Sequence, residues 1–242
     1  TRNARMYTDF FIDKEEMKDY KEGEKVAVEI KSWDSPKNSP VGKIIKSFGF
    51  GDDSLDAYSI LYEYGLSTEF EEKVEEEAQK ISPAITKEEI KKRRDMRGEL
   101  TFTIDPVDAK DFDDAISFKK IEENKYEVGV HIADVSHYVR PGTKIDDEAQ
   151  NRATSVYLVD RVIPMLPETL SNNLCSLRPN EEKLTFSAVF VMNKNGDIKE
   201  EWFGKTITES DVRLSYEEAQ HIIETGEVKI PKEHTILKKE KT

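Results

Sequence analysis

The chain has 242 residues, a net charge of −13 and 36% charged residues. This length suffices for one or two domains with a buried core, while the negative charge argues against an extended basic surface for nucleic acid. Cys175 is the single cysteine, so an internal disulfide is excluded and a reducing cytoplasm is favoured. The sequence shows no signal peptide and no apolar run long enough to span a bilayer. A cytoplasmic protein without membrane contact is therefore expected.

The first 50 residues predict β-structure. Residues 26–30 alternate apolar and polar side chains, as a half-buried strand does, and residues 41–45 predict the next strand. Between them, residues 33–40 are rich in turn formers. The pattern fits the last part of a small OB or cold-shock-like barrel, although many β-domains share it. Three aromatic residues are candidates for stacking on bases, with packing as the alternative: Phe10, Phe11 and Trp33.

Residues 51–99 predict a helical connector. The spacing of Thr68 and Glu71 is that of a capping box at the start of a first helix. That helix has an apolar stripe at helical spacing, formed by Phe70, Val74, Ala78 and Ile81. A second helix is predicted from Thr86 to near Gly98. Its basic cluster is expected either to steer a nucleic acid or to pair with the acidic first helix: Lys91, Lys92, Arg93, Arg94 and Arg97.

From residue 100 onwards the sequence predicts a mixed α/β domain. Residues 115–121 and 126–133 read as one β-hairpin, and residues 184–192 and 198–206 as another around Asn195-Gly196. Residues 146–158 suggest a helix and its exit. A capping box at Ser215 begins a last helix, which Gly226 ends. The whole chain is thus expected to be α+β.

An acidic segment at residues 105–114 is the main chemical signal. It holds five carboxylates and runs directly into an apolar strand: Asp105, Asp108, Asp111, Asp113 and Asp114. Carboxylates crowded in this way repel one another, and some must take up protons unless a cation neutralises them. Mg²⁺ is often held by few carboxylates, completed by waters and substrate phosphates. One or two such metals usually indicate phosphoryl chemistry.

Several other interpretations of these residues are weaker. A solvated acidic loop is the simplest alternative. A calcium EF-hand fails because Lys110 replaces the sixth-position Gly and Ile116 the twelfth-position Glu. An aspartyl phosphatase fails because no apolar strand precedes Asp111. A Ser-His-Asp hydrolase is disfavoured because its candidate residues are too close along one strand to face one another: His131, Asp134, Ser136 and His137. His131 alternates with apolar Val130 and Ile132, so it is expected either to be structural or to support a site from behind its direct ligands.

The spacing of the carboxylates carries a geometric requirement. In an extended segment, Asp105, Asp111 and Asp113 would share one face and Asp114 the other. A bend near Phe112 is therefore needed for these four to converge.

At this point the residues match a family. The string from Thr103 to Ala115 resembles the signature of the RNB catalytic domain of the RNase II/RNase R exoribonucleases. Residues 130–139, 154–168 and 170–177 agree with the family in order and spacing. The resemblance is strongest to the RNase R branch and covers nearly the whole chain.

The resemblance implies roles for individual residues. Asp105, Asp111, Asp113 and Asp114 align with the catalytic metal site, whereas Asp108 receives no role. Tyr157 aligns with a tyrosine that stacks on the last nucleotides of the RNA, and a core position is its alternative. Tyr216 resembles a position beside the RNA channel that reads the ribose, with helix packing as its alternative.

The family also implies a function. We expect a Mg²⁺-dependent, processive 3′-to-5′ exoribonuclease that hydrolyses single-stranded RNA to nucleoside 5′-monophosphates, with Mn²⁺ as an alternative metal. The competing hypothesis is a non-catalytic RNA-binding protein on the same fold. Single-stranded RNA is the expected partner; no membrane contact is expected, and no stable protein partner follows from the sequence.

The resemblance further divides the chain into three parts. Residues 1–50 correspond to a partial cold-shock-like domain, residues 51–99 to the connector, and residues 100–242 to the N-terminal part of the RNB domain. Family members continue beyond this region with phosphate-binding arginines and another OB-type domain. The chain is therefore expected to be an internal fragment that is inactive alone.

Overall fold

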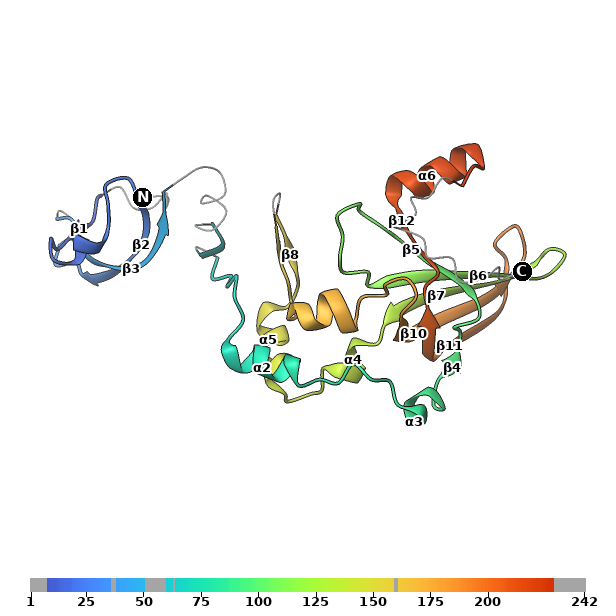
Figure 1. Ribbon diagram of the computed structural model, residues 1–242. Helices are drawn as coiled ribbons and strands as arrows, with labels where there is room; N and C mark the ends of the chain where they lie inside the picture. The colour runs from blue at the N-terminus through green and yellow to red at the C-terminus, as the bar shows by residue number, and fades with distance from the viewer. Residues whose placement is uncertain (1–7, 36–37, 51–59, 63, 159–160, 229–242) are drawn as a thin grey trace. The chain divides into compact units, whose positions relative to one another are not determined.

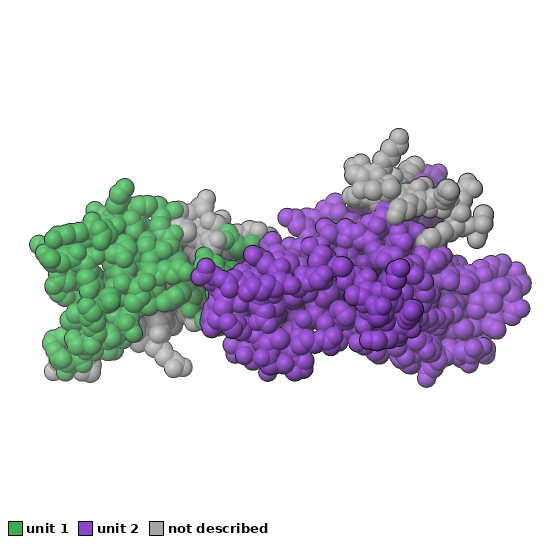
Figure 2. Space-filling view, turned by 60° about the horizontal axis from the view of Figure 1, so that its bottom comes forward, with its two compact units in different colours: residues 1–69, 156–163 green, residues 70–155, 164–242 purple. Residues whose placement is uncertain are grey.

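The computed structural model describes residues 8–35, 38–50, 60–62, 64–158 and 161–228. Two compact units make up the chain (Figure 2). Unit 1 contains residues 1–69 and 156–163, and unit 2 contains residues 70–155 and 164–242. The first part of the expected connector, residues 51–59, lies outside the described residues. The three-part division expected from the sequence stays a prediction.

Unit 1 is built on a three-stranded sheet with the order β1-β3-β2. β2 (Lys25–Ser32) and β3 (Val41–Gly49) are antiparallel, which confirms the two expected strands, and β1 (Phe11–Ile12) is parallel to β3. A 3-10 helix, Glu16–Asp19, lies between β1 and β2. Gly42 is required on β3, because a Cβ there would lie 2.2 Å from Cγ1 of Val28. A second, two-stranded sheet pairs β8 (Val156–Tyr157) with β9 (Val162–Ile163).

Unit 2 is built on a seven-stranded sheet with the order β12-β5-β6-β7-β10-β11-β4 (Figure 1). Strands β6 and β7 form one antiparallel hairpin and β10 and β11 another, as the sequence predicts. The structure adds that the two hairpins are joined by the antiparallel pair of β7 and β10. Parallel pairs close both edges, β12 with β5 and β4 with β11. The strands are β4 (Arg94–Asp95), β5 (Leu100–Asp105), β6 (Asp114–Glu122), β7 (Lys125–Ala133), β10 (Glu182–Met192), β11 (Ile198–Glu209) and β12 (Val212–Ser215).

Five α-helices and one π-helix are described in unit 2. They are α2 (Glu72–Gln79), α3 (Lys87–Ile90), α4 (Val135–Tyr138), α5 (Lys144–Arg152), the π-helix η2 (Leu170–Leu174) and α6 (Tyr216–Thr225). The capping box at Ser215 and the left-handed Gly226 confirm the expected ends of α6. In Figure 1, α6 follows β12 at the edge of the sheet.

Two predicted helix boundaries are wrong. The N-cap of α2 is Glu71 without a side-chain cap, so Thr68 does not form the predicted capping box. Ser67 instead makes a local turn by bonding the backbone of Glu69. Thr86 does cap α3, but that helix ends at Ile90 rather than near Gly98. The chain beyond it pairs with β11 as β4, so a tertiary contact replaces further helix.

The main hydrophobic core of unit 2 gathers residues from helices, from strand ends and from the acidic loop. Val74 and Ala78 of α2 supply the buried part of the predicted apolar stripe, and Ile145 comes from α5. The other buried members are Phe112, Ala115, Ala133, Leu170, Leu174, Cys175 and Leu177. Because Phe112 belongs to this core, the acidic segment 105–114 is anchored in it.

The two faces of the large sheet differ in polarity. One face, named here the polar sheet face, is buried and carries Ser117, His131, Thr185, Ser187 and Thr206. The opposite face, named the apolar sheet face, carries exposed Phe118, Val130, Ile132, Phe186 and Phe203. Among the described residues, no helix has the length and apolar character needed to cross a membrane.

Candidate metal centre

The acidic segment connects two neighbouring strands of the sheet. Asp105 is the last residue of β5 and Asp114 is the first residue of β6, and these strands are antiparallel. Residues 106–113 form the loop between them, named here the carboxylate loop; Asp111 and Asp113 lie within it. Two antiparallel neighbours joined by one loop have their connected ends on the same side of the sheet. The order of the sequence therefore brings the four carboxylates to one end of the strands.

Phe112 anchors the carboxylate loop in the core, while the bend expected near this residue stays a prediction. Its side chain is 4% exposed and packs in the hydrophobic core, whereas Asp113 and Asp114 are exposed and Asp111 is half-buried. The backbone on both sides of this ring is fixed by hydrogen bonds. Leu177 N–H donates to the Phe112 carbonyl at 2.8 Å, and Ala133 N–H donates to the Asp113 carbonyl at 3.0 Å.

The four carboxylates share one electrostatic environment. Partial loss of water raises the pKa of Asp113 to about 6, and the charges of Asp111, Asp114 and Asp105 add to the rise. Burial likewise raises the pKa of Asp105, with repulsion from Asp114 and Asp111 adding to it. Without a cation, the cluster therefore retains protons near pH 6 that isolated carboxyl groups would have lost.

The residues present fit a hard divalent cation. One oxygen of Asp105, Oδ2, is buried without a hydrogen-bond partner, as an atom intended for a ligand would be. Among the residues that the structure describes, no three or more His, Cys, Asp or Glu side chains lie together closely enough to hold a metal ion. Mg²⁺ commonly binds through few carboxylates and takes its other ligands from water and substrate phosphates. The fit to this ion therefore rests on the chemistry of the carboxylate donors.

Arg213 braces the start of the carboxylate loop. Its guanidinium donates to the carbonyl of Pro106 at 3.1 Å and also to the carbonyl of Val107. It lies 5.0 Å from the centre of the Phe112 ring, and its charge opposes the upward shift in the pKa of Asp105. Sequence reasoning gave Arg213 no role, because its contacts lie about 107 positions away along the chain.

The two tyrosines expected to contact RNA are both exposed. Tyr216 is 57% exposed, and it follows Ser215, the register partner of Asp105 in the parallel β12–β5 pair. The strand pairing therefore brings the start of α6 to the same sheet edge as Asp105. Tyr157 is 65% exposed on the β8–β9 hairpin of unit 1. Its exposure argues against the core alternative, and its stacking role stays a prediction.

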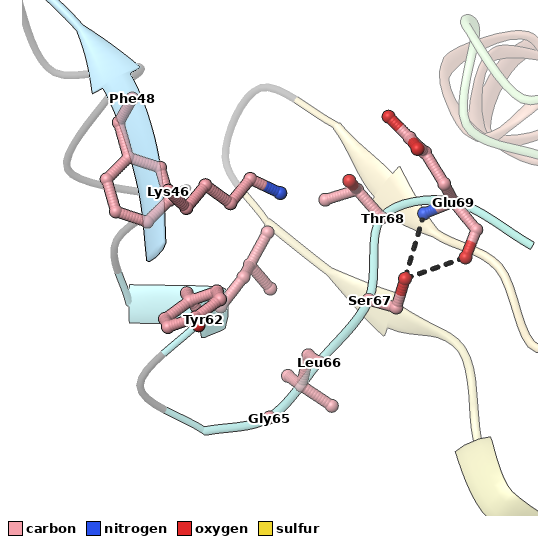
Figure 3. A pocket seen from close by; sticks show the side chains of 9 residues that line it. Lys46, Phe48, Tyr62, Gly65, Leu66, Ser67, Thr68 and Glu69 are labelled. Atoms are coloured by element: carbon pink, nitrogen blue, oxygen red, sulfur yellow. Dashed lines mark hydrogen bonds between the residues drawn. The ribbon is translucent and has the colours of Figure 1, made fainter. Parts of the chain in front are cut away.

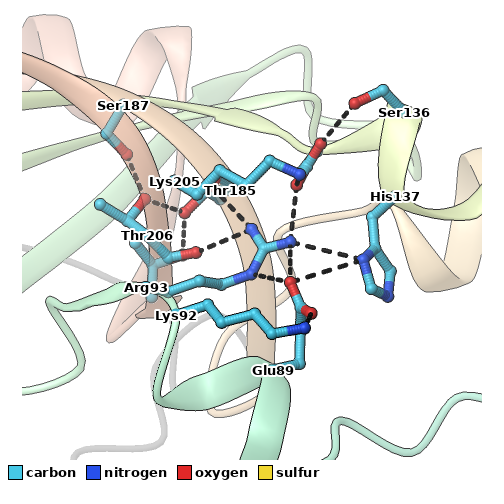
Figure 4. Close-up of polar contacts among 11 residues, drawn as sticks. Glu89, Lys92, Arg93, Ser136, His137, Thr185, Ser187, Lys205 and Thr206 are labelled. Atoms are coloured by element: carbon cyan, nitrogen blue, oxygen red, sulfur yellow. Dashed lines mark hydrogen bonds and ion pairs between the residues drawn. The ribbon is translucent and has the colours of Figure 1, made fainter.

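The basic cluster predicted on the second helix is held by carboxylates of unit 2. The Arg93 side chain is fully buried and bonds Asp134 at 2.7 Å, Glu89 at 2.8 Å and the Thr185 carbonyl at 3.2 Å (Figure 4). Burial opposes the charge of Asp134, but hydrogen bonds from Ser136 and Arg93 outweigh it and lower the pKa of that carboxyl.

The neighbouring arginines have partners of the same kind. Arg94 pairs with Glu127, and Arg97 pairs with Asp95 and Glu182. These ion pairs hold β4 and the residues next to it against the sheet. The two alternatives drawn from the sequence, RNA steering and pairing with the acidic first helix, did not anticipate these partners.

Unit 1 contains a pocket of about 450 Å³ that the sequence reasoning missed (Figure 3). Its lining includes the cation of Lys46 and the aromatic rings of Phe48 and Tyr62. The two rings pack edge to face, with 5.7 Å between their centres. Lys46 and Phe48 are two residues apart on β3, so the alternation of a strand gave a signal for this pair. By contrast, Trp33 is 43% exposed, and its indole N–H donates to the Asn38 carbonyl.

Comparison with family models agrees with this two-part organisation. Residues 93–241 match the RNB domain, and residues 1–71 match a cold shock domain. Among similar proteins, DIS3-like exonuclease 2 of Xenopus tropicalis is 45% identical over 83% of this chain and 24% of its own length. Ribonuclease R of Aquifex aeolicus is 42% identical over 88% of this chain and 30% of its own length.

Solved structures give the same result. Mycoplasma genitalium RNase R in complex with double-stranded RNA matches with a TM-score of 0.83 and 29% identity over 91% of this chain and 40% of that one. Yeast Ssd1, described as a pseudonuclease, matches with a TM-score of 0.68 and 24% identity over 85% of this chain and 26% of that one, which shows a shared fold. The chain spans between about a quarter and two fifths of the length of these relatives. It belongs to the RNB-domain family of RNase II/RNase R exoribonucleases, with a cold-shock region preceding the RNB domain.

Proposed function

We propose that the protein is a Mg²⁺-dependent exoribonuclease that degrades single-stranded RNA processively from the 3′ end and releases nucleoside 5′-monophosphates. The observation that carries the proposal is the group of four interacting carboxylates at one end of the sheet, Asp105, Asp111, Asp113 and Asp114. Mn²⁺ has the same preference for oxygen ligands and is the alternative metal. Cytoplasmic location stays a prediction from cysteine usage.

The carboxylates of the cluster would hold the metal. When bound, Mg²⁺ supplies an activated water, shields the phosphate charge and stabilises the leaving oxygen. The protein's part is to keep the carboxylates in place: Phe112 anchors their loop in the core, and Arg213 braces its start. The backbone of Asp105 is held at the end of a paired strand, and its Oδ2 is buried without a hydrogen-bond partner.

RNA binding is assigned to exposed aromatic and basic side chains. Tyr157 and Tyr216 offer exposed rings, and the unit 1 pocket combines Lys46 with Phe48 and Tyr62. Aromatic stacking tolerates every base, which suits an enzyme that degrades RNA of any sequence. The matching Mycoplasma genitalium RNase R structures are complexes with double-stranded RNA and with ribose-methylated single-stranded RNA, which supports RNA as the partner.

The competing function is RNA binding without catalysis. The likeness to a pseudonuclease gives this alternative its weight, since the fold alone does not decide between the two. All four aspartates of the family signature are retained here, and this retention favours the enzyme.

The test uses the full-length protein with Asp113→Asn or Asp114→Asn. Both changes keep the side-chain shape and remove a charge, so RNA affinity is expected to stay near normal. Hydrolysis of a labelled single-stranded RNA should fall by about 100-fold or more, because metal catalysis supplies several kcal/mol of transition-state stabilisation.

Asp108→Asn is the matched control, since Asp108 is an exposed carboxylate of the same loop outside the proposed metal set. Its activity should be that of the unaltered protein. Undiminished turnover by both Asp113→Asn and Asp114→Asn would reject the metal assignment.

A further inference from the structure

One buried hydroxyl group holds the backbone on both sides of Asp111. Ser176 is 0% exposed. Its Oγ donates to the carbonyl of Lys110 at 2.8 Å and accepts from the N–H of Phe112 at 3.1 Å. A single oxygen atom therefore binds the backbone both before and after Asp111. Rotation of the peptide group on either side of Asp111 would break one of these hydrogen bonds.

The position of this hydroxyl is itself fixed. Ser176 follows the π-helix η2, and its own N–H donates to the carbonyl of Asn173 at 3.2 Å. The next residue, Leu177, donates to the carbonyl of Phe112, and its side chain is in the same core as the Phe112 ring. Three hydrogen bonds thus join residues 110–112 to residues 176–177. We name this contact the Ser176 clamp.

The clamp surrounds one proposed ligand and lies next to another. Asp111 is enclosed by it, and Asp113 follows directly, with its carbonyl held by Ala133. Loss of the hydroxyl would leave the buried N–H of Phe112 and the partly buried carbonyl of Lys110 without this partner, and the backbone would have to shift or admit water to satisfy them. Either change moves the Asp111 and Asp113 carboxylates, because the loop has no helix or strand geometry of its own to restore them.

We propose that Ser176 is a positioning residue that sets the spacing of the Asp111 and Asp113 carboxylates for metal binding. The inference rests on the proposed function, since it assigns a second layer of support to the same metal site. Ser176 touches neither RNA nor the reacting atoms in this scheme. Side chains that orient metal ligands commonly change metal affinity or activity by about 10- to 100-fold when removed.

The experiment compares Ser176→Ala with Ser187→Ala in the full-length protein. Ser187 is also buried, at 1% exposure, and its hydroxyl also makes two hydrogen bonds, with His131 and Thr206. Both changes therefore remove one buried hydroxyl group, but only one of them touches the carboxylate loop. Thermal unfolding of both variants measures how much stability each loses from the removal of a buried hydroxyl group. An effect on metal binding counts only where it exceeds this general loss.

The first readout is the Mg²⁺ concentration that gives half-maximal RNA hydrolysis. We expect it to rise by about tenfold or more in Ser176→Ala and to stay within about twofold in Ser187→Ala, with RNA affinity in EDTA unchanged in both. An equal metal requirement in the two variants would overturn the positioning role while leaving the proposed function intact.

The second readout needs neither metal nor activity. Amide hydrogen exchange of residues 106–113 in EDTA should accelerate in Ser176→Ala and remain unchanged in Ser187→Ala. Unchanged exchange in both variants would show that the Ser176 clamp does not hold the carboxylate loop. If the unaltered protein shows no metal-dependent hydrolysis, the proposed function fails on that result alone, and exchange still decides whether the clamp exists. Should Ser176→Ala unfold at the assay temperature, Ser176→Cys keeps a side chain of similar size with a weaker donor, and the same outcomes apply.

Discussion

His131 is enclosed in the polar sheet face, and this fixes its protonation. Its side chain is fully buried, with Nδ1 2.6 Å from the hydroxyl of Ser187 and Nε2 without a partner. Burial, with a smaller contribution from the nearby charge of Arg94, lowers the pKa of His131 to about 4. Gly129 makes room for the ring, because a Cβ there would lie 2.7 Å from Nε2. The structural role expected for His131 is confirmed by this enclosure.

A pH dependence of stability follows for His131. In the unfolded chain its pKa returns to about 6.5, so the unfolded state binds more protons between about pH 4 and 6.5. The native state is therefore fully favoured above pH 6.5 and loses up to about 3 kcal/mol as the pH falls to 4. Urea unfolding of the wild type and of His131→Gln measures this, and the difference between them should shrink towards acid. Parallel curves would show that His131 is charged in the native state.

Tyr157 carries a prediction about products. In the full-length protein, Tyr157→Ala removes a stacking surface worth about 1–3 kcal/mol per base. The smallest limit product of single-stranded RNA should lengthen, because short ends are held less firmly. The products are resolved on a denaturing gel. An unchanged ladder would return this exposed ring to a role outside RNA binding.

Single residues were predictable only where their partners are near in sequence. The carboxylates lie within a segment of ten consecutive residues, 105–114, so their grouping follows from chain order. The expectation of a bend near Phe112 follows from the same spacing. Ser176 and Arg213 lie far along the chain from the loop they hold. Periodicity and spacing carry no information about contacts at such separations, which are set by strand pairing and core packing.

At the scale of elements, the end of α5 contains a local conflict. Ala153 lies after Arg152 with a φ of 63°, a region that L-residues other than glycine avoid. Its N–H nevertheless closes the helix by donating to the carbonyl of Ala149 at 2.9 Å. The hydrogen bond keeps the residue in this conformation at the cost of a crowded Cβ.

Ala153→Gly should therefore stabilise the protein. Removing the Cβ relieves about 1 kcal/mol of strain, part of which the greater freedom of glycine in the unfolded chain offsets. Urea unfolding should show a gain of several tenths of a kcal/mol or more. Ala149→Gly, inside the same helix and buried, should instead lose about 1 kcal/mol or more. A loss of stability in Ala153→Gly would contradict the strain.

Elements with strong local signals matched the sequence, and those decided by tertiary contacts did not. The strands of both long hairpins and the capped helix α6 follow from alternation, turn residues and the capping box. The segment after Ile90 has helical propensity, yet Arg93 is buried against Asp134 and residues 94–95 pair with β11. Burial of an ion pair and sheet hydrogen bonds outweighed propensity there.

At the scale of the whole molecule, the exposed rings of the apolar sheet face contrast with the high charge of the chain. Phe186 and Phe203 are 49% and 57% exposed on adjacent strands, in a chain with 36% charged residues. Apolar patches of this kind bind other apolar surfaces. Composition could not reveal the patch, because it gives only the average over all residues. It does not show that these aromatic rings lie on one face of the sheet.

The 242-residue chain should accordingly bind a hydrophobic dye such as anilinonaphthalene sulfonate. Replacing Phe186 and Phe203 together by Lys should reduce the dye fluorescence by about half or more, since two rings of the patch are lost. Ile223→Lys is the control, because Ile223 is 77% exposed on α6, outside the apolar sheet face. Equal fluorescence in all three proteins would show that the patch is not available to ligands.

The order in which the carboxylate loop and its supports occur along the chain has a consequence for synthesis. The clamp residue follows Phe112 by 64 positions, and Arg213 follows Pro106 by 107 positions. Ribosomes add roughly 5–20 residues per second, so a growing chain carries its aspartates for roughly 5–20 s before Arg213 exists. During that interval the nascent polypeptide is tethered to its own message. The proposed RNA-degrading site lacks its supports from Ser176 and Arg213 during that interval, so chain order delays the proposed hazard until more of the domain has emerged.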